Sequence, residues 1–255
     1  DGGEQVNTGT GDIILITDIV GGSGTNDSID FTTTGTFTLA PNGESFVTAF
    51  RWNPVVSGSD FDFPGNSGDY FNFLRIENVA SLGGLTIGEY TGTGLPGDSQ
   101  FNVTNTSDVT ISTATSIAGP ISVYGGNIEL NQNLSSTLAN AAILLQASGN
   151  IGTANSVKTI TTNNGNISLI GDADADGSGQ LDLDYTNYEA GTGNILFRGE
   201  TFSWATHESG VKPTINNTTG TFTLESSDES FGQGVDVAWF NFPSTLTGYT
   251  IGKSS

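Results

Sequence analysis

The seven residues Thr-Thr-Gly-Thr-Phe-Thr-Leu at 33–39 recur without change at 218–224. Similar sequence segments flank both copies in the same order. Upstream and downstream, the matched segments are 11–15 with 193–197 and 84–88 with 248–252. An ordered series of this kind indicates a duplicated structural unit rather than a short motif used twice, and internal repetition constrains the fold more than any other feature of a sequence.

The matches divide the chain into two unequal parts. Residues 1–175 form one full unit, and residues 176–255 form a partial second copy that matches about 1–92. The first copy holds an extra segment near 57–80, which we expect to be a lateral loop or hairpin. The chain should therefore represent about one and a half units of a longer tandem repeat.

A shorter period lies inside the unit. The tripeptide Gly-(Asn/Asp)-Ile begins at residues 11, 126, 149, 165 and 193. Each copy leads into a short stretch in which apolar and polar residues alternate, as they do in a strand with one buried face. From Ile128 onward the spacings are 23, 16 and 28 residues, which average near one coil of a β-solenoid.

Two features favour a solenoid over two packed sheets. Asn and Thr recur at equivalent points of successive strands, where their side chains can form ladders between coils. Each strand also has few hydrophobic residues, which suits a narrow core between stacked coils better than a broad one between sheets. The sequence predicts an all-β fold, a parallel β-helix with a lateral insertion, and the alternative is an array of β-sandwiches.

The composition argues against several classes of function. The chain has 27 acidic and 6 basic residues and a net charge of −21, which argues against binding to nucleic acid or directly to an anionic membrane. Such a surface suits salty surroundings and can collect divalent cations. There is no cysteine, so the chain can form neither disulfide bonds nor a metal site with thiolate ligands. No signal peptide or apolar spanning run is present, and we expect the chain to be processed or cut from something longer.

The stretch SIAGPISVYGGNIELNQNLSST at 116–137, followed by strands of the GLTIG and GNISL types, resembles the haemagglutinin-like repeats of large secreted bacterial adhesins. These include the gliding-type surface adhesins of Bacteroidetes. The resemblance covers most of the chain and consists of a recurring pattern of Thr, Gly, Asn and Ile residues. It implies a right-handed parallel β-helix that serves as a stalk or adhesive surface, at the cell surface or secreted, and it carries over no catalytic residue.

The strongest local motif is DADADGSGQLDLD at 172–184. Asp172, Asp174 and Asp176 occupy alternate positions and Gly177 follows, as in the first half of an EF-hand-type calcium loop. A turning loop of this kind aims three carboxylates inward, and glycine permits the sharp bend. The sequence therefore predicts a structural Ca²⁺ ion here, against the alternative of a solvated acidic turn.

The second half of the motif departs from the calcium loop. Position eight is Gly179 instead of an aliphatic residue, position twelve is Leu183 instead of Glu, and no flanking helices are evident. The remaining ligands would be Ser178 through its carbonyl, Gln180 through a water, and Asp182 or Asp184 through a carboxylate. An ion held in this way would stiffen the junction between units rather than catalyse a reaction.

Other clusters carry weaker signals. Residues 59–73 combine carboxylates with aromatic side chains, a mixture that can grip sugars or a protein partner, although we expect a hairpin with its own apolar cluster. We expect Trp52, Trp204 and Trp239 to cap or fill the core. His207 is the only histidine, and a zinc site normally needs more than one His or Cys ligand. The sequence therefore disfavours a zinc site and a Ser-His-Asp triad, and we expect His207 to lie on the surface.

Seven Asn-x-Ser/Thr sequons occur in this Asn-rich and Thr-rich chain. Their asparagines are Asn26, Asn102, Asn105, Asn133, Asn166, Asn216 and Asn217. Each is either a glycosylation site or a ladder residue inside the solenoid.

These observations lead to one main expectation and two alternatives. We expect a non-enzymatic structural or adhesive repeat of a bacterial extracellular fibre, whose partners are neighbouring repeats, copies of itself, or a surface glycan or host ligand. The first alternative is a carbohydrate-binding or ice-binding module with a flat Thr-rich face. The second is a polysaccharide-active β-helix enzyme, which the scattered positions of the six basic residues disfavour.

Overall fold

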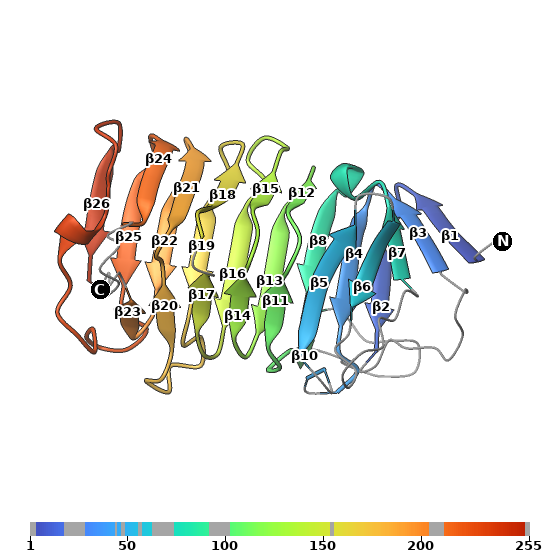
Figure 1. Cartoon of the computed structure of the whole chain (residues 1–255), viewed down its shortest axis with the longest axis horizontal. Coiled ribbons are helices and arrows are strands. Elements are labelled where there is room, and N and C mark those ends of the chain that lie inside the picture. Colours follow the sequence, from blue (N-terminus) through green and yellow to red (C-terminus); the bar gives the residue numbers. More distant parts are fainter. Residues whose placement is uncertain are drawn as a thin grey trace.

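The computed structural model describes residues 4–17, 29–43, 45–46, 49–55, 58–62, 74–91, 103–153, 156–203 and 212–252. Parallel strands stack into a β-solenoid of about seven turns with almost no helix, from β1 near the N-terminus to β26 near the C-terminus (Figure 1). The prediction of a parallel β-helix is confirmed, and the β-sandwich alternative is wrong. Within the described residues, no helix has the length and apolarity needed to cross a membrane.

Three sheets form the sides of the solenoid. The nine-stranded sheet, called the long sheet below, contains β2 (Ile13–Ile16), β4 (Thr36–Ala40), β8 (Gly84–Ile87), β13 (Ile121–Gly125), β16 (Ile143–Ala147), β19 (Ile167–Ile170), β22 (Ile195–Arg198), β25 (Thr221–Glu225) and β26 (Gly248–Ile251), in this order. The seven-stranded sheet contains β23 (Thr201–Ser203), β20 (Gln180–Asp182), β17 (Ile151–Thr153), β14 (Ile128–Leu130), β11 (Val109–Ile111), β5 (Phe50–Val55) and β6 (Gly58–Asp62). The five-stranded sheet contains β12 (Thr115–Ile117), β15 (Leu134–Ser136), β18 (Lys158–Thr162), β21 (Thr186–Gly191) and β24 (Thr214–Thr218).

Smaller elements complete the first coils. A three-stranded sheet contains β1 (Glu4–Gly9), β3 (Ile29–Thr33) and β7 (Leu74–Glu77), and β9 (Glu89–Tyr90) pairs antiparallel with β10 (Val103–Thr104). In the part of the chain that the structure describes, the short 3₁₀ turns are η1 (Val79–Ser81) and η2 (Val237–Trp239). In the first coils the three-stranded sheet therefore precedes the long sheet along the chain, as the five-stranded sheet does in the later coils.

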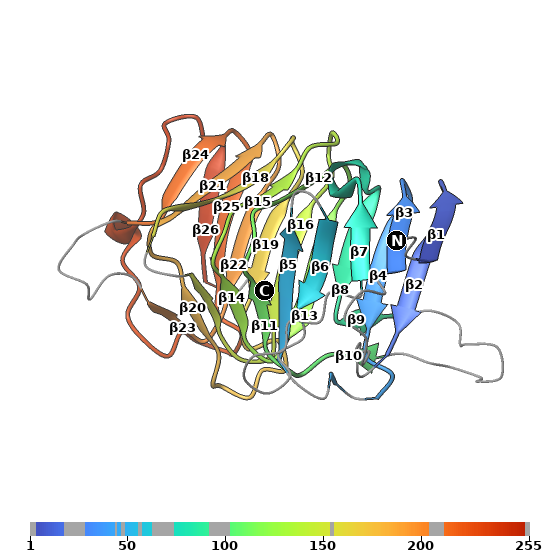
Figure 2. The same cartoon turned by 45° about the vertical axis from the view of Figure 1, so that its right-hand side comes forward.

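The first described part of the insertion predicted at 57–80 forms a hairpin with β5, whereas the last part is not an insertion, because β7 pairs in parallel with β3 in the solenoid. Strands β5 and β6 pair antiparallel, with Arg51 opposite Asp62 and Val55 opposite Gly58, and β6 forms one edge of the seven-stranded sheet (Figure 2). Residues 63–73 of the acidic and aromatic segment lie outside the described residues. The antiparallel pair is a side branch, because β11 continues the parallel stack from β5.

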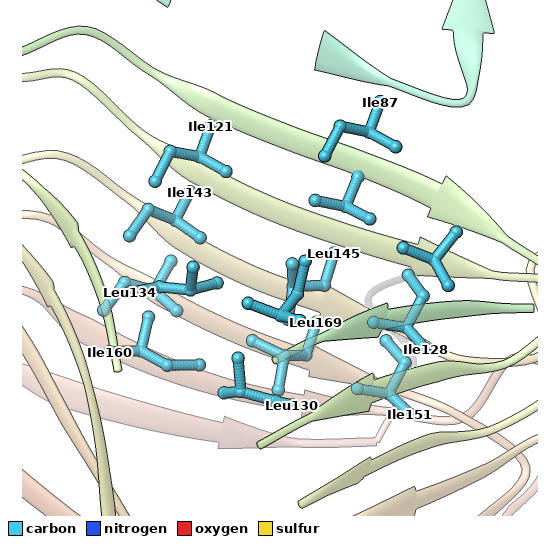
Figure 3. Packing of buried hydrophobic residues seen from close by; sticks show 14 of the residues in the cluster. Ile87, Ile121, Ile128, Leu130, Leu134, Ile143, Leu145, Ile151, Ile160 and Leu169 are labelled. Carbon is cyan, nitrogen blue, oxygen red and sulfur yellow. The ribbon is translucent and has the colours of Figure 1, made fainter. Parts of the chain in front are cut away.

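Aliphatic side chains from all three sheets fill the narrow core. On the long sheet Ile121 lies in register with Leu85 on one side and with Ile143 on the other, and all three are at most 2% exposed. Figure 3 shows how Ile128 and Ile151 of the seven-stranded sheet enter the same core. Because every parallel pairing sets an inward residue on an inward residue, the buried side chains form continuous columns.

Polar ladders run along the corners of the coil. At the corner before the seven-stranded sheet, the side-chain Oδ1 of Asp108 accepts a hydrogen bond from the backbone N–H of Asn127 at 2.9 Å. Asn127 Oδ1 accepts in turn from Asn150 N at 2.9 Å, and Asn150 Oδ1 accepts from Gln180 N at 2.8 Å. Each side chain thereby satisfies a backbone donor of the next coil that would otherwise be unpaired at the turn. These contacts confirm the predicted ladders at the asparagine positions.

The Gly-(Asn/Asp)-Ile tripeptide serves two different corners, which explains its irregular spacing. The copies that begin at 126 and 149 lead into the seven-stranded sheet, whereas those that begin at 11, 165 and 193 lead into the long sheet. The spacings of 23 and 28 residues therefore measure whole coils, and the spacing of 16 measures the path from one corner to the other.

The duplicated segments occupy corresponding positions at the two ends of the solenoid. In the first copy the consecutive long-sheet strands are β2, β4 and β8, and in the second they are β22, β25 and β26. Asp12 Oδ1 accepts from Thr36 N at 2.7 Å, and the equivalent Asn194 Oδ1 accepts from Thr221 N at 2.9 Å. In the long sheet the sequence match is therefore a match of structure and hydrogen bonding, while the unit boundary at residue 175 and the number of copies stay predictions.

Candidate metal site

Three carboxylates gather in the loop between β19 and β20. One ligand oxygen from each of Asp172, Asp174 and Asp176 lies within 4.8 Å of the other two. Asp172 is buried, and Asp174 and Asp176 are exposed. Three carboxylates this close repel one another unless a cation lies among them, so the group could hold a metal ion.

Asp172 is the structural centre of this loop. Its Oδ1 accepts hydrogen bonds from the backbone N–H groups of Asp176 at 3.0 Å and Gly177 at 3.2 Å. Its Oδ2 accepts from the hydroxyl of Ser227, which lies beyond β25, at 2.5 Å. A buried carboxylate needs such donors in place of water. Asp172 therefore folds its own loop and ties that loop to a segment 55 residues further along the chain.

The other predicted ligands have different surroundings. Ser178 donates from both its backbone N–H and its hydroxyl to Asp176 Oδ1, so it supports that carboxylate. Gln180 N belongs to the asparagine ladder described above. Asp182 lies in β20, where its Oδ1 accepts from Asp184 N at 3.3 Å, and it is not a member of the three-carboxylate group. Roles for Ser178, Gln180 and Asp182 as metal ligands stay predictions.

The two departures from the calcium-loop pattern have structural causes. A Cβ atom at Gly179 would lie 2.2 Å from Asp172 N, so position eight has no room for an aliphatic side chain. Leu183, at position twelve, is 0% exposed and belongs to the solenoid core. The loop returns to the stack of strands at this point, so the chain cannot place a twelfth-position glutamate over the cluster.

Other predicted residues have structural roles where the structure describes them. Trp52 is 1% exposed and donates through Nε1 to Thr115 Oγ1 at 2.7 Å, and Trp239 is half-buried against the core. His207 and Trp204 lie outside the described residues.

Three of the sequon asparagines also have structural roles. Asn105 is 1% exposed, and Asn133 and Asn166 accept backbone hydrogen bonds from the next coil as ladder residues. The asparagines of these three sequons thus serve the fold, whereas Asn26 and Asn102 lie outside the described residues.

One buried lysine lies outside every predicted site. Lys158, the first residue of β18, is 3% exposed and donates from Nζ to the carbonyl oxygen of Ser156 at 3.0 Å. Burial lowers the pKa of its amine below the ordinary value of 10.5. No sequence signal marks it, because a single lysine at the start of a strand normally faces water.

We predict that Lys158→Met raises the free energy of unfolding at pH 7 by about 1 kcal/mol, because it removes a charge that folding takes out of water. Between its folded-state pKa and 10.5 the amine binds more protons in the unfolded chain, so the penalty fades as the pH rises through that window. The advantage of the variant should therefore shrink toward pH 10.5. Urea unfolding of both proteins across this pH range measures the difference in their free energies of unfolding. A difference that does not change with pH contradicts the prediction. Lys212→Met, at an exposed position, is the control.

Comparison with protein-family models, with curated proteins and with solved structures finds no match in any of the three. The resemblance to haemagglutinin-like adhesin repeats therefore stays a prediction, and the case for a function rests on the geometry of the chain itself.

Proposed function

We propose that this chain is a non-enzymatic structural segment of a bacterial extracellular fibre or surface adhesin. The observation that carries the proposal is the correspondence between the two ends of the solenoid, in which β2, β4 and β8 match β22, β25 and β26 in order and in their corner hydrogen bonds. A unit that begins to repeat itself in register can be extended along one axis without any new kind of contact. Extension along one axis is what a stalk requires.

The charge and the chemistry of the chain agree with this role. A net charge of −21 keeps such a rod soluble in salty surroundings and away from nucleic acid. The absence of cysteine leaves the fold insensitive to the redox state of its surroundings.

The proposal is tested on intact cells of the organism that produces the chain. Antibodies raised against the full chain should label thin fibres outside the cell in electron micrographs without permeabilisation. Labelling only after permeabilisation contradicts an extracellular role. Release of sugars from a panel of plant and algal polysaccharides by the purified chain contradicts the non-enzymatic part and supports the alternative of a β-helix enzyme.

We further propose that the ion held by the three carboxylates is Ca²⁺. Carboxylate oxygens suit hard cations, and calcium accepts the variable geometry of loop carboxylates more readily than magnesium, which requires a nearly ideal octahedron. Asp174 and Asp176 are exposed and supply charge, while Asp172 links the loop to Ser227. Calcium would then stabilise the contact between coils.

We predict that millimolar Ca²⁺ raises the melting temperature of the chain. An ion that binds only the folded state adds about 2.7 kcal/mol at a concentration one hundred times its dissociation constant. The double variant Asp174→Asn, Asp176→Asn should lose the shift and keep the fold, because Asp172 retains its three donors. Differential scanning calorimetry with and without Ca²⁺ measures the effect. Glu129→Gln removes an exposed carboxylate of β14 as the matched control, and an equal shift in both variants contradicts the site.

A second candidate function has one observation in its favour. Along the outward face of the long sheet, the central column contains no charged residue over nine strands despite the acidity of the chain. Its members in register are Ile14, Thr38, Thr86, Ser122, Leu144, Ser168, Leu196, Thr223 and Thr250. Such a column suits a neutral glycan or ice, although Leu144 and Leu196 interrupt the hydroxyls. Glycan-array binding or thermal hysteresis that Thr223→Lys abolishes would favour this function over a plain stalk.

A further inference from the structure

The last strand of the long sheet leaves its core positions uncovered. In β26, Tyr249 is 65% exposed and Ile251 is 37% exposed, although they stand in register with Phe222 and Leu224, which are 0% exposed. Tyr249 continues the aromatic stack of the core, with its ring 6.1 Å from that of Phe242. These side chains therefore occupy inward positions, and the surface that they form is a section through the core.

The first copy shows what covers such a surface. Strand β8 is the counterpart of β26, and its inward residues Leu85 and Ile87 are 2% and 0% exposed. They are buried because β13 lies beside β8, with Ile121 opposite Leu85 and Val123 opposite Ile87. The edge formed by β26 should therefore accept a parallel strand that has aliphatic residues at two alternate positions.

A strand of that chemistry forms the opposite edge of the long sheet. Strand β2 has the sequence Ile-Ile-Leu-Ile, and its inward residues Ile13 and Leu15 pair with Phe37 and Leu39 of β4. Among the described residues, β2 pairs with β4 alone and β26 pairs with β25 alone. Neither edge strand contains a charge, a proline or a bulge, the devices that normally prevent one sheet edge from pairing with another.

We propose that these two edges bind each other, so that β2 of one copy of the chain pairs in parallel with β26 of a second copy. Ile13 then lies beside Tyr249, Ile14 beside Thr250 and Leu15 beside Ile251, the inward-on-inward register of every pairing in the long sheet. The two surfaces differ, so the contact is heterologous and repeats along the axis into a filament. The inference rests on the proposed fibre role and identifies the contact that would extend the fibre.

Electrostatic repulsion sets the conditions for this association. Each copy has a net charge of −21, and end-to-end contact brings two acidic bodies together. Salt screens this repulsion over about 8 Å at physiological ionic strength and over about 3 Å at 1 M. Association should therefore strengthen as salt is added, the opposite of what two oppositely charged surfaces would show.

Sedimentation velocity of the full chain over a hundredfold range of concentration tests the proposal. We expect a series of species that grows with concentration and is favoured by 1 M NaCl. Ile251→Asp should abolish the series, whereas Leu138→Asp, at a position 58% exposed and away from both edges, should leave it intact. Association that both variants retain equally overturns the proposed contact.

Disulfide trapping tests the register. The chain has no native cysteine, so the double variant Ile14→Cys, Thr250→Cys carries only the two thiols that the proposed pairing brings within bonding range. Oxidation should yield a ladder of covalent oligomers on a non-reducing gel, and each single variant should yield dimers at most. Failure of the double variant to form the ladder, at a concentration where the full chain associates, overturns the register.

A different occupant of the β26 edge would also be detected. Residues 1–252 can be joined to a second copy of residues 89–175, which continues the chain after β26 as it continues after β8. If this longer chain gains stability and protects Tyr249 while the full chain stays monomeric at every concentration, a following coil covers the edge and the self-association proposal is wrong. That result leaves the fibre role intact, because surface labelling tests the fibre role separately.

Discussion

Gly119→Ala should lower the free energy of unfolding by about 3 kcal/mol, because it forces a methyl group into a corner that has no space for one. A Cβ atom at this position would lie 1.6 Å from the carbonyl oxygen of Gly83 in the preceding coil. The backbone cannot retreat easily, since Gly119 N donates to Leu82 O at 2.9 Å and Gly119 O accepts from the Ser136 hydroxyl at 2.7 Å. The corner before the long sheet contains similar contacts at Gly165, Gly193 and Gly220.

The matched control for this prediction is Gly152→Ala in β17. A Cβ atom at Gly152 would meet nothing within 4 Å. The free energy of unfolding of this variant should therefore stay within about 0.5 kcal/mol of that of the parent protein. Urea denaturation followed by circular dichroism gives both values. Equal denaturation midpoints for the two variants would show that the corner can relax and that the close approach does not constrain the coil.

Phe222→Ala should cost about 3–5 kcal/mol, the usual effect of removing a large aromatic side chain from a closed core. Phe222 is 0% exposed, and its ring centroid lies 5.4 Å from that of Phe197, 5.2 Å from that of Phe240 and 5.0 Å from that of Phe242. Its loss would remove the shared contact of this aromatic cluster near the end of the solenoid.

The neighbouring variant Thr223→Ala controls for strand propensity. Thr223 lies in the same strand but faces outward, so its substitution should cost less than about 1 kcal/mol. A loss at Thr223 as large as that at Phe222 would mean that the strand, rather than the aromatic cluster, determines the stability of this coil. Chemical denaturation with a fluorescence signal from the tryptophans separates the two results.

The sequence predicted the features that repeat, because repetition turns a local preference into a pattern. A single Asn before a strand indicates only a turn, but Asn127 and Asn150 at equivalent points indicated that a ladder connects the coils. The duplicated heptapeptide similarly predicted corresponding strands, which β4 and β25 are. The existence of two corners stayed hidden, since the same tripeptide marks both and only the path of the coil distinguishes them.

The loop with the three carboxylates contains contacts that a local sequence pattern cannot predict. The alternating aspartates predicted three carboxylates that do lie together, because that arrangement is set within five residues. The contact between Asp172 and Ser227 spans 55 residues and has no counterpart in the local sequence. The surroundings of Gln180 and Asp182 likewise depend on where β20 joins the seven-stranded sheet, and a loop template does not contain that information.

The parallel stacking of coils determines how a tether built from this unit would respond to load. Backbone hydrogen bonds between coils run along the solenoid axis, so tension between the two ends pulls each bond lengthwise and opens the coils one after another instead of shearing a whole sheet at once. The coil from Ile167 to Ile195 contains 28 residues and adds one strand spacing of about 4.8 Å to the folded rod. Pulled straight, the same residues span about 95 Å. Each coil that opened under force would therefore release roughly twenty times its folded length, so a fibre of the proposed kind would lengthen in steps under load.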